Sequence, residues 1–249
     1  MGFSAFLPVG HPYRSIPDNI AIAGLGDSNM NGFFDSIPSS SATDNGGEVA
    51  MIAEMKKYYS GANCRIINGG VNSSKLLKSA DAGNSWYNDV DSGFTTAFNS
   101  WKNKVENWLN RGGSIPIILI NIGINDASVG SPPSAAAMLT GYNGLISQCR
   151  AVIGDITGNY NTPVGMIPVG RRGNTSIDTF QNTRQAQRDC VSGGSNVFFT
   201  PEMYDLALGD STVHLSEAIA AVHGARTVKR CMVAAGKTVT GQVDCPTWT

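Results

Sequence analysis

The sequence predicts an α/β fold in which a parallel sheet of about five strands lies between two layers of helices. Five short apolar segments alternate with longer segments in which apolar residues recur every three or four positions. The short segments are apolar on both faces, which is typical of parallel strands covered by helices on both sides. Ligands bind such sheets outside the carboxyl ends of the strands, so the residues that follow each strand are the candidates for function.

The apolar segments predict the strands. Residues 115–122 (IPIILINI) are the most apolar stretch and are expected at the centre of the sheet. Residues 20–26 (IAIAGLG) form a second buried strand that ends in glycine. The other three expected strands are residues 65–68, 164–169 and 196–200.

The helical spacing is clearest in residues 94–110, which end before two consecutive glycines at 112 and 113. The apolar positions of this segment are Phe94, Phe98, Trp101, Val105 and Trp108. Ser216 is a candidate N-cap for a last helix, with Glu217 in its first turn. The other expected helices, with this last one, are residues 48–59, 135–153, 177–191 and 216–235.

The length of 249 residues suits one domain with a large core. We expect a single domain over residues 1–249, with an N-terminal arm at 1–18 and an irregular tail at 237–249. The polar stretches 35–47 and 79–93 are expected to be surface loops, which could equally shape a substrate cleft.

The charge composition excludes some function classes. Charged residues make up 15% of the chain and the net charge is −1, so the basic surface that nucleic acid requires is not expected. No apolar run approaches the ~20 residues of a membrane span. The first residues do not resemble a signal peptide, while the low charge is common in extracellular and virion proteins. The oligomeric state is not predicted.

The five cysteines form no C-x-x-C pair and match no zinc-site spacing, so no metal site is expected from them. Four of them lie in predicted strands or helices and are expected to be small buried hydrophobic residues. A disulfide between Cys231 and Cys245, joining the last helix to the tail, is the alternative for that pair.

Three polar segments follow the first three strands. Ser28, in the sequence GDSN, can present its hydroxyl at the top of the sheet near a helix N-terminus, or it can simply cap a turn. Residues 68–74 (NGGVNSS) can bring backbone N–H groups beside Ser28, or form a flexible turn. Asn125, in the sequence GIND, can point its amide at a developing oxyanion, or cap an Asx-turn.

One histidine is a good candidate for a general base. His11 lies in the N-terminal arm and His223 lies in a predicted helix, whereas His214 lies in a loop before the last helix. Asp210 precedes His214 by four residues and could orient its imidazole.

The four segments, in this order, resemble the four motif blocks of the SGNH (GDSL-like) hydrolases, over Gly26 to His214. The resemblance implies a flavodoxin-like three-layer α/β/α fold and a serine esterase with Ser28 as nucleophile, His214 as base and Asp210 as acid. It also implies an oxyanion hole formed by the N–H groups of Ser28 and Ser73 and the amide of Asn125, with no cofactor.

Shorter matches resemble the carbohydrate O-acetylesterase branch, which includes sialate O-acetylesterases and acetylxylan esterases. Residues 28–30 (SNM) and 213–216 (VHLS) match segments of that branch, and Arg184 and Gln187 match its Arg-x-x-Gln helix. The GIND segment departs from the branch's Gln-Gly-Glu. This resemblance implies an acetylated carbohydrate, or another small ester, as substrate.

Two departures from the family pattern affect the site. Ser73 stands where the family has a glycine, which a backbone N–H donor tolerates. The family's acid lies three residues before the histidine, where this chain has Ser211. We therefore expect a one-residue bulge that lets Asp210 serve, or greater reliance on a dyad, with Asp205 and Glu202 as substitutes.

Three other functions compete with this one. A lipase or thioesterase would share the fold, but no long apolar lid segment is visible. A non-catalytic carbohydrate-binding or virion module would not need Ser28, Asn125 and His214 together. A flavodoxin-like cofactor binder would carry a G-x-G-x-x-G sequence after the first strand, which this chain lacks.

Overall fold

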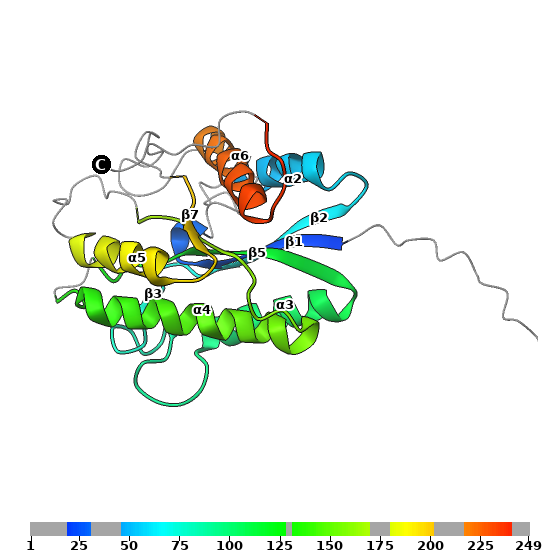
Figure 1. The fold of residues 1–249 in the computed structure, drawn as a ribbon. Helices are drawn as coiled ribbons and strands as arrows, with labels where there is room; N and C mark the ends of the chain where they lie inside the picture. Colours follow the sequence, from blue (N-terminus) through cyan, green and yellow to red (C-terminus); the bar gives the residue numbers. More distant parts are fainter. Residues whose placement is uncertain (1–18, 31–45, 128–130, 170–179, 202–216, 241–249) are drawn as a thin grey trace, which may run out of the picture.

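The computed structural model describes residues 19–30, 46–127, 131–169, 180–201 and 217–240 (Figure 1). Its central sheet has five parallel strands in the order β2-β1-β5-β6-β7. The prediction of a parallel sheet of about five strands is therefore confirmed. The strands are β1 (Asn19–Gly26), β2 (Asn63–Gly70), β5 (Gly113–Asn121), β6 (Val164–Met166) and β7 (Val197–Phe199).

Helices cover both faces of the sheet and give the predicted three-layer α/β/α sandwich (Figure 1). Ala21, Ala23 and Leu25 of β1 face a core shared with α3, α4 and α5. Ile20 and Ile22, which alternate with them, face a second core shared with α2 and α6. The helices are α2 (Gly46–Tyr58), α3 (Thr96–Asn110), α4 (Ala135–Thr157), α5 (Gln181–Gly193) and α6 (Glu217–Ala234).

Local chemistry explains where the elements end differently from the predicted bounds. The Thr95 side chain accepts a hydrogen bond from Phe98 N at 3.2 Å, so α3 begins at residue 96 rather than 94. The α4 helix continues past residue 153 until Gly158, which takes a left-handed φ of 77°. Strand β6 ends at Met166, shortly before Pro168, which has no N–H to pair.

The prediction of a surface loop over residues 79–93 is wrong in part. Strands β3 (Lys75–Leu77) and β4 (Ser85–Tyr87) form a separate parallel pair, and Trp86 is completely buried. The segment packs on α4. Within the predicted loop, polar neighbours concealed the buried Trp86, and Leu76 and Leu77 of β3, directly before the loop, are buried in the same core.

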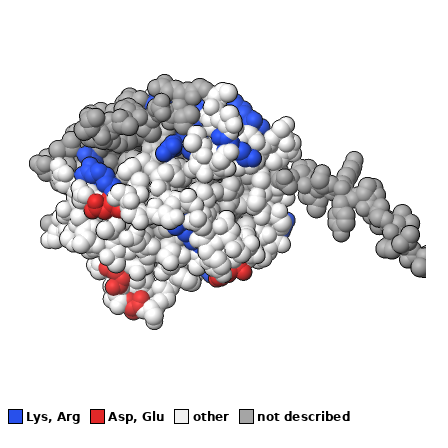
Figure 2. Space-filling view, in the orientation of Figure 1, with Lys and Arg blue, Asp and Glu red and all other residues white. Residues whose placement is uncertain are grey.

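Few charged residues lie on the face of the molecule shown in Figure 2, which is mostly white with separate groups of basic and acidic atoms. None of the helices in the described part of the chain is long and apolar enough to span a bilayer. Four cysteines are buried and form no disulfide among the described residues, as the sequence predicts for small core residues: Cys64, Cys149, Cys190 and Cys231. Cys245 lies outside the described residues.

The contact between α4 and Tyr87 gives the first testable prediction. A Cβ on Gly144 would lie 2.3 Å from the ring of the half-buried Tyr87, so the ring would have to shift and lose part of its packing on α4. We expect Gly144→Ala to lower the free energy of unfolding by about 1–3 kcal/mol, despite the better helix propensity of alanine. Urea titration measures the change.

Gly193→Ala is the matched control, because Gly193 is also in a helix and a Cβ there would meet nothing within 4 Å. This control should leave the stability unchanged or slightly higher. Equal stability of the Gly144→Ala protein and the wild type would show that β4 does not pack on α4 as described.

Candidate active site

The sheet order places a topological switch point at the carboxyl ends of β1 and β5, where open parallel sheets bind ligands. Strand β1 has β2 on one side and β5 on the other, so the connections after β1 and β5 leave toward opposite faces. Gly26 of β1 pairs with Asn121 of β5, and Ser28 and Asn125 follow these paired ends by two and four residues. Ser28 is half-buried at the start of a helical turn, so two of the predicted site residues share this edge of the sheet.

Gly26 is required where it stands. A Cβ there would lie 1.9 Å from the carbonyl oxygen of Asn121. The N–H of Asp27 donates to that same oxygen at 2.9 Å, so β1 and β5 are tied together directly before Ser28. Any side chain at position 26 would separate the two strands that place Ser28.

The loop after β2 is fixed to the end of β1. The N–H of Val71 donates to the Gly26 oxygen at 2.9 Å. Ser73 has an exposed side chain and a φ of 60°, the left-handed conformation that glycine adopts most easily. The serine therefore keeps the backbone shape expected of the family's glycine, at a cost of about 1 kcal/mol.

A buried hydrogen-bond network that the sequence did not predict holds the same loop. Ser74 Oγ donates to the Gly26 oxygen at 3.2 Å. Trp86 Nε1 lies 2.9 Å from Ser74 Oγ and 3.1 Å from the Gly26 oxygen, so its N–H is shared between them. Ser74 and Trp86 are both fully buried, which makes these bonds difficult for water to replace.

Asn125 reaches this loop from the other side. Its Nδ2 donates to the carbonyl oxygen of Ser74 at 3.0 Å. An amide nitrogen carries two hydrogens, so this bond orients the side chain and, among the described residues, leaves the second hydrogen for a ligand. Gly123 permits the turn, because its φ is +123° and a Cβ would lie 2.5 Å from Tyr142 Oη.

Two carboxyl groups are buried beneath these loops. Burial, with a smaller contribution from Asp126, raises the pKa of Asp27 to about 7, against an opposing hydrogen bond from the Asn29 N–H. Burial raises the pKa of Asp126 to about 6, against the N–H groups of Leu76 and Leu77. Within the described residues, Asp27 Oδ2 has no hydrogen-bond partner, which a protonated carboxyl tolerates better than a carboxylate.

Helix α5 places the Arg184 and Gln187 pair at the end of β6. The buried Gln187 accepts from Val169 N at 3.0 Å and donates to the Ile167 oxygen at 3.4 Å. Arg184 Nε lies 3.4 Å from the Val169 oxygen, and its guanidinium stands over the Phe180 ring. These contacts fix the backbone at the same carboxyl edge of the sheet as Ser28.

The predicted acid and base lie outside the described residues. His214, Asp210, Ser211, Asp205 and Glu202 all fall in residues 202–216. Their roles therefore stay predictions.

The last predicted helix does contain His223, as expected. Its ring is completely buried, with Nδ1 3.0 Å from Thr227 Oγ1. Burial inside α6 supports the sequence interpretation that passed over His223 as the base.

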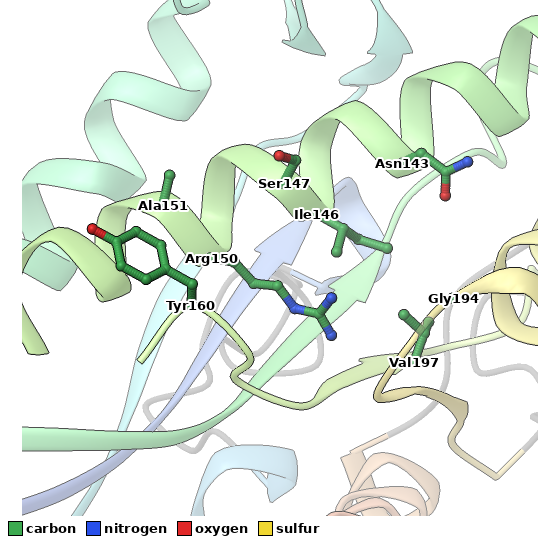
Figure 3. Close-up of a pocket in the computed structure, with 8 residues that line it drawn as sticks. All are labelled: Asn143, Ile146, Ser147, Arg150, Ala151, Tyr160, Gly194 and Val197. Atoms are coloured by element: carbon green, nitrogen blue, oxygen red, sulfur yellow. The ribbon is translucent and has the colours of Figure 1, made fainter. Parts of the chain in front are cut away.

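A hollow lies at the opposite edge of the sheet, away from the candidate site residues. It encloses about 350 Å³ beside α4, and Figure 3 shows Arg150 extending from the helix toward the start of β7. The Arg150 guanidinium donates to three backbone oxygens, those of Thr162 (3.0 Å), Ser195 (2.7 Å) and Asn196 (3.1 Å). Its charge is therefore used to join the entries of β6 and β7 to α4. Among the described residues, no group of three His, Cys, Asp or Glu side chains could hold a metal ion.

Comparisons with known proteins agree on the fold. No family model and no curated protein sequence matches the chain. Among solved structures, a protein from Arabidopsis thaliana is similar over 87% of this chain and 99% of its own, with a TM-score of 0.64 and 15% identity. A carbohydrate acetylesterase from Sinorhizobium meliloti (TM-score 0.53, 14% identity) and an aryl esterase from M. smegmatis (0.55, 13%) each match over 86% of this chain and 99% of theirs. The chain thus has the flavodoxin-like fold of SGNH hydrolases.

The buried Asp27 carboxyl predicts a pH-dependent stability. Its pKa of about 7 in the folded chain exceeds the ~3.9 of an unfolded aspartate, so the folded state holds the extra proton between these values. Stability from this group is therefore greatest at low pH and is lost as the pH rises from about 4 to about 7. The Asp27→Asn side chain cannot titrate. Its free energy of unfolding minus that of the wild type should therefore rise by a few kcal/mol over this pH range, at ~1.4 kcal/mol per pH unit.

Urea titrations of both proteins between pH 4.5 and 8 measure this difference. Asp155→Asn, at an exposed carboxylate that accepts a hydrogen bond from Tyr160, is the control and should show a nearly constant difference. A constant difference for Asp27→Asn as well would mean that Asp27 is ionised throughout this range.

Proposed function

We propose that this protein is a serine esterase that hydrolyses short-chain esters, with acetyl groups on a carbohydrate as its substrate. The observation that carries the proposal is the anchored amide of Asn125. It is bound to the Ser74 carbonyl beside the β1/β5 switch point, where Ser28 follows β1. An oriented amide hydrogen next to a serine at a switch point suits acyl transfer.

In the proposed mechanism, Ser28 Oγ attacks the ester carbonyl while His214 takes its proton, and Asp210 stabilises the resulting imidazolium. The N–H groups of Ser28 and Ser73 and the Asn125 amide stabilise the oxyanion. Each such donor is worth ~3 kcal/mol in the transition state. His214 then protonates the leaving alcohol, and water, activated by His214, releases the acyl group from Ser28.

The short acyl group and the carbohydrate are the finer part of the proposal. The Arg184 and Gln187 pair supports them, because it resembles the Arg-x-x-Gln helix of carbohydrate O-acetylesterases and lies at the same edge of the sheet as Ser28. The structural similarity to a carbohydrate acetylesterase adds support. The aryl esterase match supports ester hydrolysis without a sugar, so small aryl acetates are the natural first assay.

Acyl chain length is the first test of the proposed function. The wild type should hydrolyse 4-nitrophenyl acetate faster than the octanoate and decanoate esters, and should release acetate from acetylated xylan. Ser28→Ala should lose activity by a factor on the order of 10³ or more, because the covalent intermediate cannot form. Initial rates by absorbance, and acetate release by chromatography, measure these outcomes.

Faster hydrolysis of the long-chain esters would favour the lipase or thioesterase alternative. Rates that do not exceed the uncatalysed background, for both the wild type and Ser28→Ala, would favour a non-catalytic module. In that case, binding of xylan by both proteins would identify it as a carbohydrate-binding one.

The acid partner of His214 is tested separately. Asp210→Asn should keep the fold and lower kcat by ~10²- to 10⁴-fold, less than Ser28→Ala does, because the imidazolium loses its charge partner while the nucleophile remains. Ser211→Ala is the matched control and should retain near wild-type kcat, since a neutral hydroxyl cannot offset the imidazolium charge. The reverse order of the two variants would assign the acid role differently and would overturn the expected one-residue bulge.

A further inference from the structure

Asp126, the residue after Asn125, has contacts that the catalytic proposal does not use. Its side chain is completely buried. Oδ2 accepts a hydrogen bond from the N–H of Leu76 at 2.8 Å, and Oδ1 lies 3.5 Å from the N–H of Leu77. These two residues belong to β3, fifty positions earlier in the chain.

The same dipeptide therefore binds one loop at two points. Asn125 donates to the Ser74 oxygen, and Asp126 accepts from Leu76 two residues further on. Two hydrogen bonds two residues apart oppose a shift of this segment along β3. Ser73, whose N–H the proposed oxyanion hole uses, directly precedes this doubly held stretch.

The loop is also held from the side of β1. The Gly26 oxygen accepts from Val71 N and from Ser74 Oγ, and Gly26 lies two residues before Ser28. Asp126 thus completes a frame in which the loop after β2 is held by β1 on one side and by the turn after β5 on the other. Removal of either side would let Ser73 move relative to Ser28.

Solvation makes a purely structural role for this carboxyl costly. A buried carboxylate loses the hydration it had in water, and hydrophobic side chains of similar volume often stabilise a fold as well as a buried charge does. Hydrogen bonds from backbone N–H groups to a charged oxygen are short and directional, which suits a group whose task is to fix a loop. The 2.8 Å contact with Leu76 has this character.

We propose that Asp126 is a positioning residue for the oxyanion hole, which it orders by holding the backbone of Leu76 against the turn after β5. The inference rests on the proposed esterase function. Displacement of an oxyanion donor by ~1 Å costs on the order of 10²-fold in rate, so the residue is expected to act on kcat although it touches no substrate.

The test is Asp126→Asn, which has the same shape. One amide oxygen can still accept from Leu76, but the amide NH₂ faces the N–H of Leu77, where donor meets donor. With 4-nitrophenyl acetate, kcat should fall by ~10- to 100-fold. KM should stay close to the wild-type value, because ground-state binding of a small ester does not need the oxyanion hole.

Asp89→Asn is the matched control. Asp89 lies in the same β3–β4 region and accepts a hydrogen bond from Ser79 N at 2.8 Å, but it is exposed and far along the chain from Ser73. Its kcat and KM should match the wild type. A fall in kcat for Asp126→Asn no larger than that for Asp89→Asn overturns the proposal, as does a rise in KM with kcat unchanged.

A double-mutant cycle separates positioning from general loss of stability. If Asn125 and Asp126 hold the same loop, Asn125→Ala and Asp126→Asn should be less than multiplicative in kcat, because either one alone already releases Ser73. Independent, multiplicative effects would contradict a shared role. Active-site titration corrects each kcat for the folded fraction.

Hydrogen exchange distinguishes failure of this inference from failure of the proposed function. If the wild type has no activity that depends on Ser28, the esterase proposal fails, but exchange in residues 71–77 should still be faster in Asp126→Asn than in Asp89→Asn. Unchanged exchange in this segment overturns the positioning role. If Asp126→Asn does not fold, Asp126→Ser replaces it, and if neither variant folds, Asp126 serves the fold as a whole and the positioning role is wrong.

Discussion

The backbone oxygen of Gly26 accepts hydrogen bonds from the N–H of Val71, from Ser74 Oγ and from Trp86 Nε1. A carbonyl oxygen has two lone pairs, so three donors crowd around it and leave no room for a change in loop position. On the other side, Gly26 approaches the Asn121 backbone so closely that only glycine fits. Among the described residues, the segments that carry Ser28, Ser73 and Asn125 are placed relative to this peptide unit, directly or through Ser74.

The close packing around the Gly26 oxygen also affects the two carboxyl groups buried next to it. Asp27 and Asp126 lie where water is excluded, and their negative charges oppose each other. Backbone N–H groups oppose the rise in pKa at both sites, those of Leu76 and Leu77 at Asp126 and those of Asn29 and Ile124 at Asp27. Burial still raises the two pKa values to about 6 and about 7. Burial thus raises the pKa of both carboxyl groups, the one that holds the loop and the one next to Ser28.

Much of the fold could be predicted from the sequence, because strands that are buried on both faces of the sheet appear in the sequence as nearly continuous apolar runs. The apolar run of β5 and the helical spacing of α3 are unambiguous, and both elements are present. The β3–β4 segment was missed because only three of its positions are buried and apolar, too few to outweigh its polar residues. Its strands depend on packing against α4, which no local pattern reveals.

The site was predicted in part for a similar reason. Ser28, Ser73 and Asn125 stand out because they follow strands, and the described structure attaches their segments to the same carboxyl edge of β1 and β5. The anchors Ser74, Trp86 and Asp126 have no distinctive spacing, since their roles come from contacts between segments up to 60 residues apart. The available signal for Asp126 was that two polar residues, Asn125 and Asp126, follow each other directly at the end of the GIND segment.

The central claim is that this frame activates Ser28 and no other nucleophile. Covalent labelling with diethyl 4-nitrophenyl phosphate, followed by mass spectrometry of the digested protein, tests it most directly. The account predicts one diethylphosphoryl adduct, on Ser28, with labelling abolished in urea because the oxyanion donors are then dispersed. Labelling of another residue in the folded protein, or no adduct at all, would contradict it.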